Sequence, residues 1–331
     1  MKLAIFGAGA IGCLLAWALT RSGHSPTLVA RGDTLKALRN GLTVAPKEGP
    51  SETIALRLSD DVEALGRQDF VIGTLKAQDW QGALPALRRL VGPDTTLVPA
   101  VNGITWRYFD GLDGPYVGTN LAAVDAEGAL MHAFPAERVV GCVVHTGVVR
   151  ITPASIQWLT GGRFVVGSLS PKVDTRADKI AGILRAGGFV TDVGADIRRE
   201  VWTKLMNNAV VNPLSVVAQT TMGGLAGNAS LLQVTREAMA EVVAVAAAVG
   251  APVSITIEQR MALNATMGAM KTSMLQDFEA GRSLELGSVV DAVVEIGRLV
   301  GVSTPVTATI GQLAAGVAAL RHGVTSERGG P

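Results

Sequence analysis

The sequence predicts an α/β domain built on a parallel, doubly wound sheet, followed by an all-α domain. Short apolar runs that fit buried strands alternate with helical patterns through the first half of the chain. From about Ala177 the pattern becomes helical, and 331 residues are enough for two domains that each have a core. We therefore expect domains at 1–176 and 177–322, and a disordered, glycine-rich tail at 323–331.

The first apolar run has two interpretations. A basic Lys2 followed by an apolar stretch could begin a signal peptide or a membrane anchor. Against this, Gly7, Gly9 and Gly12 form a G-x-G-x-x-G pattern that directly follows an apolar strand at Leu3–Phe6. A helical pattern and a second strand come next. This order is typical of a Rossmann-like dinucleotide-binding domain, which is the interpretation we favour.

Each glycine has a predicted task in this turn. Gly7 allows the tight turn, Gly9 lets the backbone approach a pyrophosphate, and Gly12 lets helix and strand pack closely. The helix N-terminus offers free N–H groups and the positive end of its dipole to the phosphates. The predicted cofactor-binding residues here are Gly7, Ala8, Gly9, Ala10, Ile11 and Gly12.

The end of the second strand, Thr27–Ala30, predicts which cofactor is preferred. NAD sites usually place an acidic residue at this point, whereas this chain has Arg31. A guanidinium can pair with a 2′-phosphate in bidentate fashion, so we expect NADPH. The alternative is that Arg31 is a solvated loop residue. The nearby Asp33 could bind an unphosphorylated ribose, so NADH remains an alternative cofactor.

Two further strands end at polar residues. Asp69–Leu75 is followed by Lys76 and Thr96–Val101 by Asn102, with a helix expected at Trp80–Leu90 between them. Ligands of doubly wound sheets bind beyond the carboxyl ends of the strands, so both residues are candidates for the site. A shorter, antiparallel addition is expected at Val139–Val144, Gly147–Ile151 and Phe164–Val166.

The most unusual segment is an apolar helix at Arg198–Ala218. Lys204, Asn208 and Asn212 are spaced four apart, which places them on one helix face. A buried face with one amine and two amides is costly unless the groups are paired, so the face predicts a binding site. An internal hydrogen-bonded network or a solvated stripe is the alternative. Pro213 is expected to kink or interrupt the helix. Later helices are expected at Thr235–Val249, Ile255–Thr266, Ser288–Val300 and Val306–Ala319.

Composition excludes several classes of function. A net charge of +1 predicts no general attraction to nucleic acid or acidic lipid. Cys13 and Cys142 have no disulfide or metal spacing and are expected to be buried free thiols in a reducing compartment, the cytoplasm. Four scattered histidines predict no metal site.

A hydrophobic content of 48% is compatible with a homodimer through the helical domain. The aromatic-rich segment 103–140 could cap a pocket, form a subunit contact or be a surface loop.

The chain resembles the ketopantoate reductases, which are NADPH-dependent 2-dehydropantoate 2-reductases. The resemblance runs from Gly7 to about Leu320. It rests on GAGAIG, on TLKA around Lys76, on NG at Asn102, on EVWTKLMNNAVVNPLS and on TSMLQDFEAGRSLELGSVVDAVVEIGRLVGVSTP. It implies an oxidoreductase of pantothenate biosynthesis that reduces 2-dehydropantoate to (R)-pantoate.

The resemblance also implies a role for each matching residue. The glycine turn and Arg31 would hold NADPH, and Lys76 and Asn102 would contact cofactor and substrate. Lys204 would be the general acid. Asn208, Asn212 and Ser273 would bind the substrate, while Glu285 would pair with Lys204 or with a substrate hydroxyl. For Glu285 the alternative is a salt bridge with a neighbour such as Arg282.

Two departures from the family pattern bear on the substrate. The segment after Asn102 is longer than usual, and Gly287 stands where some members carry an acidic residue. Another branched or bulky 2-keto acid is therefore an alternative substrate. A protein that senses NADP(H) without turnover is a third hypothesis, although such a protein would not need Lys204 and Glu285.

Overall fold

The structure is a computed structural model that describes residues 1–112, 114–169 and 175–327, with side chains up to Arg321. The chain forms two compact units. The first contains Met1–Val101, Thr105–Asn120 and Glu127–Ile197, and the second contains Asn102–Ile104, Leu121–Ala126 and the chain from Arg198 onward. The domain boundary expected after residue 176 stays a prediction. The expected tail at 323–331 overlaps the end of the last helix and otherwise lies outside the described residues.

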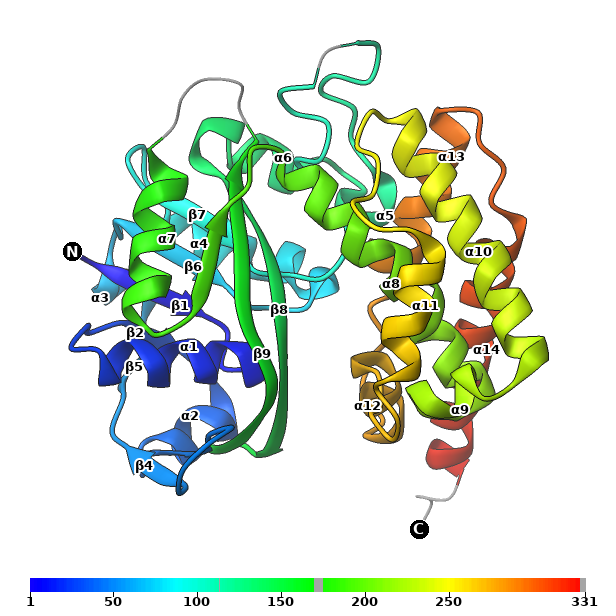
Figure 1. The fold of residues 1–331 in the computed structure, drawn as a ribbon. Helices are drawn as coiled ribbons and strands as arrows, with labels where there is room; N and C mark the ends of the chain where they lie inside the picture. The colour runs from blue at the N-terminus through cyan, green and yellow to red at the C-terminus, as the bar shows by residue number, and fades with distance from the viewer. Residues whose placement is uncertain (113, 170–174, 328–331) are drawn as a thin grey trace. The chain divides into compact units, whose positions relative to one another are not determined.

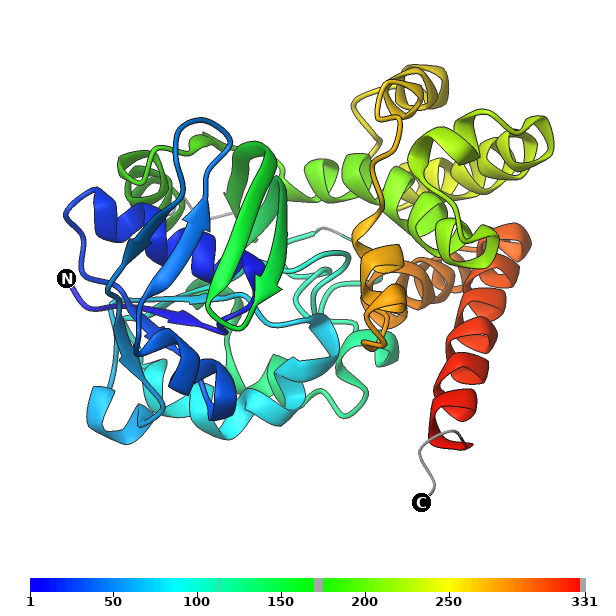
Figure 2. The same ribbon diagram turned by 90° about the horizontal axis from the view of Figure 1, so that it is seen from below.

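A five-stranded parallel sheet forms the base of the first unit, as the strand–helix alternation predicts. Its order is β5-β2-β1-β6-β7, and the register pairs β1 with β2 on one side and β6 on the other. Helices α1 (Ala10–Arg21) and α4 (Trp80–Leu90) lie on opposite faces of this sheet (Figure 2). The strands are β1 (Leu3–Phe6), β2 (Thr27–Val29), β5 (Arg57–Ser59), β6 (Phe70–Gly73) and β7 (Thr96–Pro99).

A second sheet belongs to the same unit, with the order β10-β9-β3-β4 and β8 paired to β9. Its main feature is a long antiparallel hairpin (Figure 1). Two segments predicted as separate strands form the single strand β8, because register shifts near Gly147 are accommodated within it. The strand β10 lies where a helical pattern was expected. The bounds are β3 (Leu42–Ala45), β4 (Glu52–Ile54), β8 (Val140–Thr152), β9 (Ser155–Ser168) and β10 (Val190–Val193).

The apolar helix α1 contacts both sheets, which explains its membrane-like composition. Every residue from Gly12 to Leu19 is buried, and the helix contacts β1 and β2 as well as β8 and β9. No described helix combines the length and the apolar character needed to cross a membrane. Shorter helices complete the unit: α2 (Gly32–Leu38), α3 (Val62–Leu65), η1 (Ala77–Asp79), α6 (Ala129–Ala133), η2 (Ala136–Arg138) and α7 (Arg176–Ala186).

The second unit is helical, as predicted. Its first helix, α8 (Ile197–Ala218), continues through Pro213, so the expected interruption there is wrong. Asn228 and Thr272 cap α10 and α12 by accepting a backbone N–H, which is the usual role of such side chains. The remaining helices are α5 (Ala122–Asp125), α9 (Met222–Ala226), α10 (Ala229–Ala248), α11 (Ile257–Ala265), α12 (Ser273–Glu279), α13 (Ala292–Leu299) and α14 (Pro305–Glu327).

Two short segments from the first half of the chain belong to the helical unit. The backbone N–H of Ile104 donates to the Ser288 carbonyl over 2.8 Å. The carboxylate of Glu295 accepts the N–H groups of Ala122 and Ala123, at 2.8 and 2.9 Å, and so caps α5. These bonds fix residues 102–104 to the turn that precedes α13, and residues 121–126 to the first turn of α13.

Candidate functional site

The glycine turn has the close packing that the sequence predicts. Gly7 has a φ of +115°, which a residue with a side chain rarely adopts. A Cβ on Gly12 would lie 1.9 Å from the Gly7 carbonyl oxygen. A Cβ on Gly9, in contrast, would meet only the Thr74 carbonyl oxygen, at 3.9 Å. The turn is therefore closed on its inner side at Gly12 and open above Gly9, as a pyrophosphate cradle requires.

Thr74 holds this turn in place and was not identified from the sequence. Its hydroxyl donates to the Gly7 carbonyl over 2.7 Å, and its backbone N–H donates to the Phe6 carbonyl over 2.9 Å. The available signal was its position in TLKA, two residues before Lys76. Lys76 itself is half-buried and stands just before η1 at the carboxyl end of β6.

Arg31 and Asp33 differ in their partners. Arg31 is exposed immediately before α2, and within the described part of the chain it makes no ion pair. Asp33 accepts a hydrogen bond from the ammonium of Lys36 over 3.0 Å. The guanidinium therefore remains available for an anionic ligand, while the carboxylate that could favour an unphosphorylated ribose already has a cation beside it.

Three distant parts of the chain form a polar cluster in the helical unit. The Lys204 ammonium donates to Asn102 Oδ1 over 2.8 Å, and Asn102 Nδ2 donates to Glu285 Oε2 over 3.3 Å. All three side chains are half-buried. The charges fix the orientation of the amide, because the opposite orientation would set an NH₂ group against the ammonium and an oxygen against the carboxylate. Asn102 thus bridges an amine and a carboxylate.

A π-helical turn supports this cluster. Glu285 lies just before the π-helix η3 (Gly287–Asp291), a rare form that is found mostly at functional sites. The Ser288 carbonyl in this turn accepts the Ile104 N–H. Gly103 has a φ of +81°, and a Cβ there would lie 2.2 Å from the Ser288 carbonyl oxygen. Only glycine permits this approach, which brings the neighbouring Asn102 side chain to Glu285.

The absence of a side chain at Gly287 also has a steric reason. A Cβ on Gly287 would lie 2.8 Å from the Ala123 carbonyl oxygen in α5. An acidic residue at this position would therefore require α5 to shift. Arg282, the neighbour considered as an ion-pair partner of Glu285, donates to Asp277 over 2.8 Å.

The polar face of α8 continues from Lys204 towards the C-terminus of the helix. Asn208 is half-buried and Asn212 is 6% exposed. Within the described part of the chain, neither amide side chain makes a hydrogen bond. The preceding residue, Asn207, instead accepts a hydrogen bond from Asn264 Nδ2 over 2.7 Å. The amides of Asn208 and Asn212 therefore retain their capacity to bind a ligand.

Ser273 is exposed at the first position of α12. The preceding Thr272 caps this helix, and its hydroxyl is hydrogen-bonded to the Ser215 hydroxyl at 2.7 Å. Ser215 lies three residues after Asn212 on α8, and its own hydroxyl donates to the Asn212 carbonyl. This link attaches the start of α12 to the end of the polar face.

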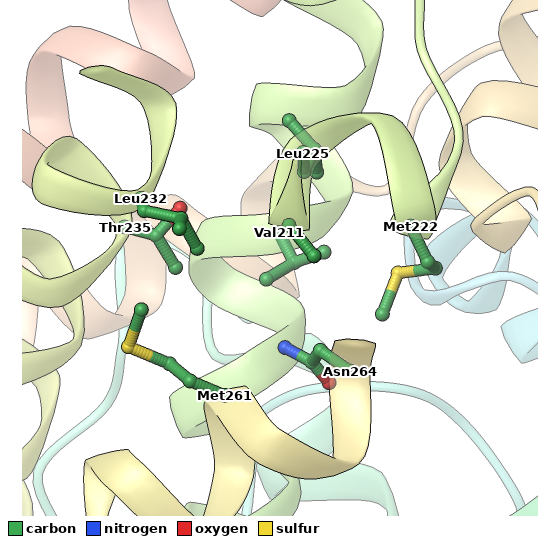
Figure 3. A pocket seen from close by; sticks show the side chains of 8 residues that line it. Val211, Met222, Leu225, Leu232, Thr235, Met261 and Asn264 are labelled. Carbon is green, nitrogen blue, oxygen red and sulfur yellow. The ribbon is translucent and has the colours of Figure 1, made fainter. Parts of the chain in front are cut away.

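A small cavity of about 20 Å³ lies beside α8 (Figure 3). It has room for about one water-sized group. Its lining is mostly apolar, with Met222, Met261 and Val211 around the space and the amide of Asn264 at its edge. The Oδ1 atom of Asn264 is buried without a hydrogen-bond partner among the described residues.

Together these features define an enzyme class. A dinucleotide-type turn in an α/β unit and an amine held by an amide and a carboxylate in a helical unit are typical of a nicotinamide-dependent oxidoreductase. Comparison with known families gives the particular family. Residues 3–171 match the model of ketopantoate reductase PanE/ApbA, and residues 196–318 match the model of its C-terminal domain. The chain belongs to the ketopantoate reductase family.

Individual relatives agree with this assignment. The chain is 37% identical over 307 residues to a 2-dehydropantoate 2-reductase of Mesorhizobium japonicum, covering 92% of this chain and 94% of the relative. A crystal structure assigned to the ketopantoate reductases, from Ralstonia solanacearum MolK2, is 34% identical, with a TM-score of 0.91 and coverage of 97% and 98% of the two chains. D-mandelate dehydrogenase in complex with NADH and anilino(oxo)acetate shares the fold, at 20% identity and a TM-score of 0.82 over 96% of this chain and 98% of that chain.

Proposed function

We propose that this protein reduces 2-dehydropantoate to (R)-pantoate with NADPH. The observation that carries the proposal is the bridge from Lys204 through Asn102 to Glu285, which holds an amine beside the ligand-binding amides of α8. The relative from Mesorhizobium japonicum, a 2-dehydropantoate 2-reductase, matches this chain over nearly its whole length.

When bound, NADPH would supply a hydride to the 2-keto carbon of the substrate. Negative charge then grows on the carbonyl oxygen, and the Lys204 ammonium stabilises that charge and donates a proton to the oxygen. Asn102 positions the amine through its Oδ1 atom. Glu285 holds Asn102 from the other side, so that the amide oxygen faces Lys204.

The remaining polar residues bind the substrate. The free amides of Asn208 and Asn212 suit the substrate's hydroxyl and carboxylate, and the Ser273 hydroxyl suits the carboxylate. Glu285 can also accept a hydrogen bond from a substrate alcohol, which would favour a substrate with a second hydroxyl. These assignments rest on the placement of the four side chains in one helical unit.

The first unit would hold the cofactor. The open space above Gly9 would take the pyrophosphate, and the Arg31 guanidinium would donate hydrogen bonds to the 2′-phosphate of NADPH. Lys76, at the carboxyl end of β6, would contact the ribose and nicotinamide side. The close approach at Gly12 keeps the start of α1 directly behind the phosphates.

A second candidate substrate is another branched or bulky 2-keto acid. The observation that favours it is Gly287, which leaves this position without the acidic side chain that some members of the family carry. D-mandelate dehydrogenase shows that this fold also serves a dehydrogenase with a different substrate.

A substrate panel tests the proposal and separates the candidates. The purified protein is mixed with NADPH and with 2-dehydropantoate, 2-oxoisovalerate or a bulkier 2-keto acid, and NADPH absorbance is followed. The proposal predicts the highest kcat/KM for 2-dehydropantoate. Faster turnover of a keto acid without a second hydroxyl would favour the second candidate. Cofactor binding without turnover of any keto acid would indicate a sensing protein.

A further inference from the structure

Arg150 brings a second guanidinium close to the predicted cofactor site. It lies near the end of β8 and is half-buried. Its Nη2 atom donates to the Thr34 hydroxyl over 2.7 Å, and Thr34 lies in the first turn of α2, three residues after Arg31. Longer hydrogen bonds of 3.3 Å run to the carbonyls of Thr152 and Pro153.

The same guanidinium is also near the glycine turn. Burial raises the pKa of the Cys13 thiol to about 11, and the positive charge of Arg150 partly counteracts this rise. Cys13 lies in the first turn of α1, and its Sγ atom donates to the Ala8 carbonyl over 3.6 Å. Arg150 thus neighbours both segments that the proposed function assigns to the cofactor.

Arg150 has only uncharged hydrogen-bond partners among the described residues. Within the described part of the chain it makes no ion pair, and every hydrogen bond that it makes goes to an uncharged oxygen. Asp33, the acidic residue nearest to Thr34 in sequence, binds Lys36. A guanidinium without a carboxylate partner can take an anion as its ligand. Its Nη1 group has no acceptor among the described residues and can donate to such an anion.

We propose that Arg150 binds the 2′-phosphate of NADPH together with Arg31 and thereby increases the preference for NADPH over NADH. The inference rests on the proposed function for the identity of the cofactor. Arg31 lies at the end of β2 and Arg150 near the end of β8, so the two guanidiniums approach the phosphate from the two different sheets of the first unit. Two guanidiniums can donate hydrogen bonds to more of the phosphate oxygens than one guanidinium can.

Calorimetric titration with NADP⁺ and NAD⁺ tests the inference without requiring turnover. For Arg150→Gln we expect NADP⁺ affinity to fall about tenfold or more, since a hydrogen bond to a charged group is lost, while NAD⁺ affinity changes by less than about twofold. Arg150→Lys, which keeps the charge but loses the forked donors, should give an intermediate loss of NADP⁺ affinity. Adenosine 2′,5′-bisphosphate and AMP should reproduce this difference, because they differ from each other only in the 2′-phosphate. Neither contains the nicotinamide.

Two controls separate ligand binding from a structural role. Thr34→Val removes the side-chain acceptor of Arg150 but leaves the charge of Arg150, so this variant should keep the preference for NADP⁺. Arg163→Gln changes another arginine of the same hairpin, one that is paired with Asp192, and should also keep it. If Thr34→Val loses as much preference as Arg150→Gln, Arg150 only anchors α2 and the inference is overturned.

The remaining outcomes are equally decisive. If the wild-type protein prefers NADP⁺ and both Arg150 variants retain the full preference, the role of Arg150 is refuted while the proposed function stands. If the wild-type protein binds NADP⁺ and NAD⁺ equally, both the proposed cofactor choice and the role of Arg150 fail.

Discussion

The glycine turn and the Asn102–Lys204–Glu285 cluster differ in how the chain builds them. The turn is one continuous segment, and its close contact between Gly7 and Gly12 joins residues five apart. The cluster joins residues from three distant segments, with separations of 102 and 183 residues in its two hydrogen bonds. A local motif can be interpreted from spacing alone, whereas a cluster of this kind depends on the packing of a whole unit.

The largest expected effect contrasts two glycines of the turn. Gly12→Ala places a Cβ 1.9 Å from a backbone oxygen, so it should abolish cofactor binding and destabilise the protein by about 1–3 kcal/mol. Gly9→Ala meets open space, so it should weaken cofactor binding while leaving stability nearly unchanged. Thermal unfolding and calorimetric titration of both variants check this. Equal loss of stability in the two variants would contradict the assignment of an open cradle above Gly9.

Gly103 tests the cluster in a similar way. Gly103→Ala would place a Cβ 2.2 Å from the Ser288 carbonyl oxygen, so the 102–104 segment must move and carry Asn102 away from Lys204. A displacement of about 1 Å can reduce kcat about 100-fold. Gly118→Ala is the matched control, because Gly118 also has a positive φ, +71°, but has no heavy atom near its Cβ position. Comparable kcat values for the two variants would contradict the positioning role of this segment.

Arg31 is expected to have a smaller, selective effect. The proposed pairing of Arg31 with the 2′-phosphate predicts that Arg31→Ala raises KM for NADPH about tenfold or more while KM for NADH changes little. Steady-state kinetics with both cofactors measure the difference. An equal rise in both KM values would mean that Arg31 does not contact the 2′-phosphate.

The smallest effect concerns Cys13, behind the turn. Its thiol is buried and has a pKa of about 11, above the ordinary 9.0, so it stays protonated at neutral pH and should resist alkylation in the folded protein. A raised pKa stabilises the fold only while the thiol is protonated, so this contribution is lost as pH rises from 9 towards 11. Mass spectrometry after iodoacetamide treatment checks the first point, and rapid labelling at neutral pH would contradict it.

The sequence predicts the fold well where patterns are local. The parallel sheet, the glycine turn and the helix Trp80–Leu90 follow from apolar runs and turn residues. The expected interruption at Pro213 was wrong, because the residues around Pro213 are buried and their packing keeps α8 helical despite a missing hydrogen bond. The strand β10 has no apolar alternation, and its pairing with β9 determines its structure.

The site could be predicted only in part, because most of its contacts join residues that are far apart in the sequence. Spacing places Lys204, Asn208 and Asn212 on one face, but no local pattern indicates that Asn102 lies between Lys204 and Glu285. The π-turn at Gly287–Asp291 and the bond of Thr74 to Gly7 depend on contacts made after folding. The same holds for Arg150, whose contact with Thr34 crosses 116 residues.

The central claim is that the amine of Lys204 donates the proton during reduction of the keto acid. The most direct test compares Lys204→Ala with the wild-type protein in NADPH oxidation by 2-dehydropantoate, with cofactor binding measured in parallel and the exposed Lys179→Ala as the control. We expect kcat to fall about 10²–10⁴-fold in Lys204→Ala with nearly unchanged NADPH affinity, and not to change in the control. A wild-type kcat in the Lys204→Ala variant would contradict it.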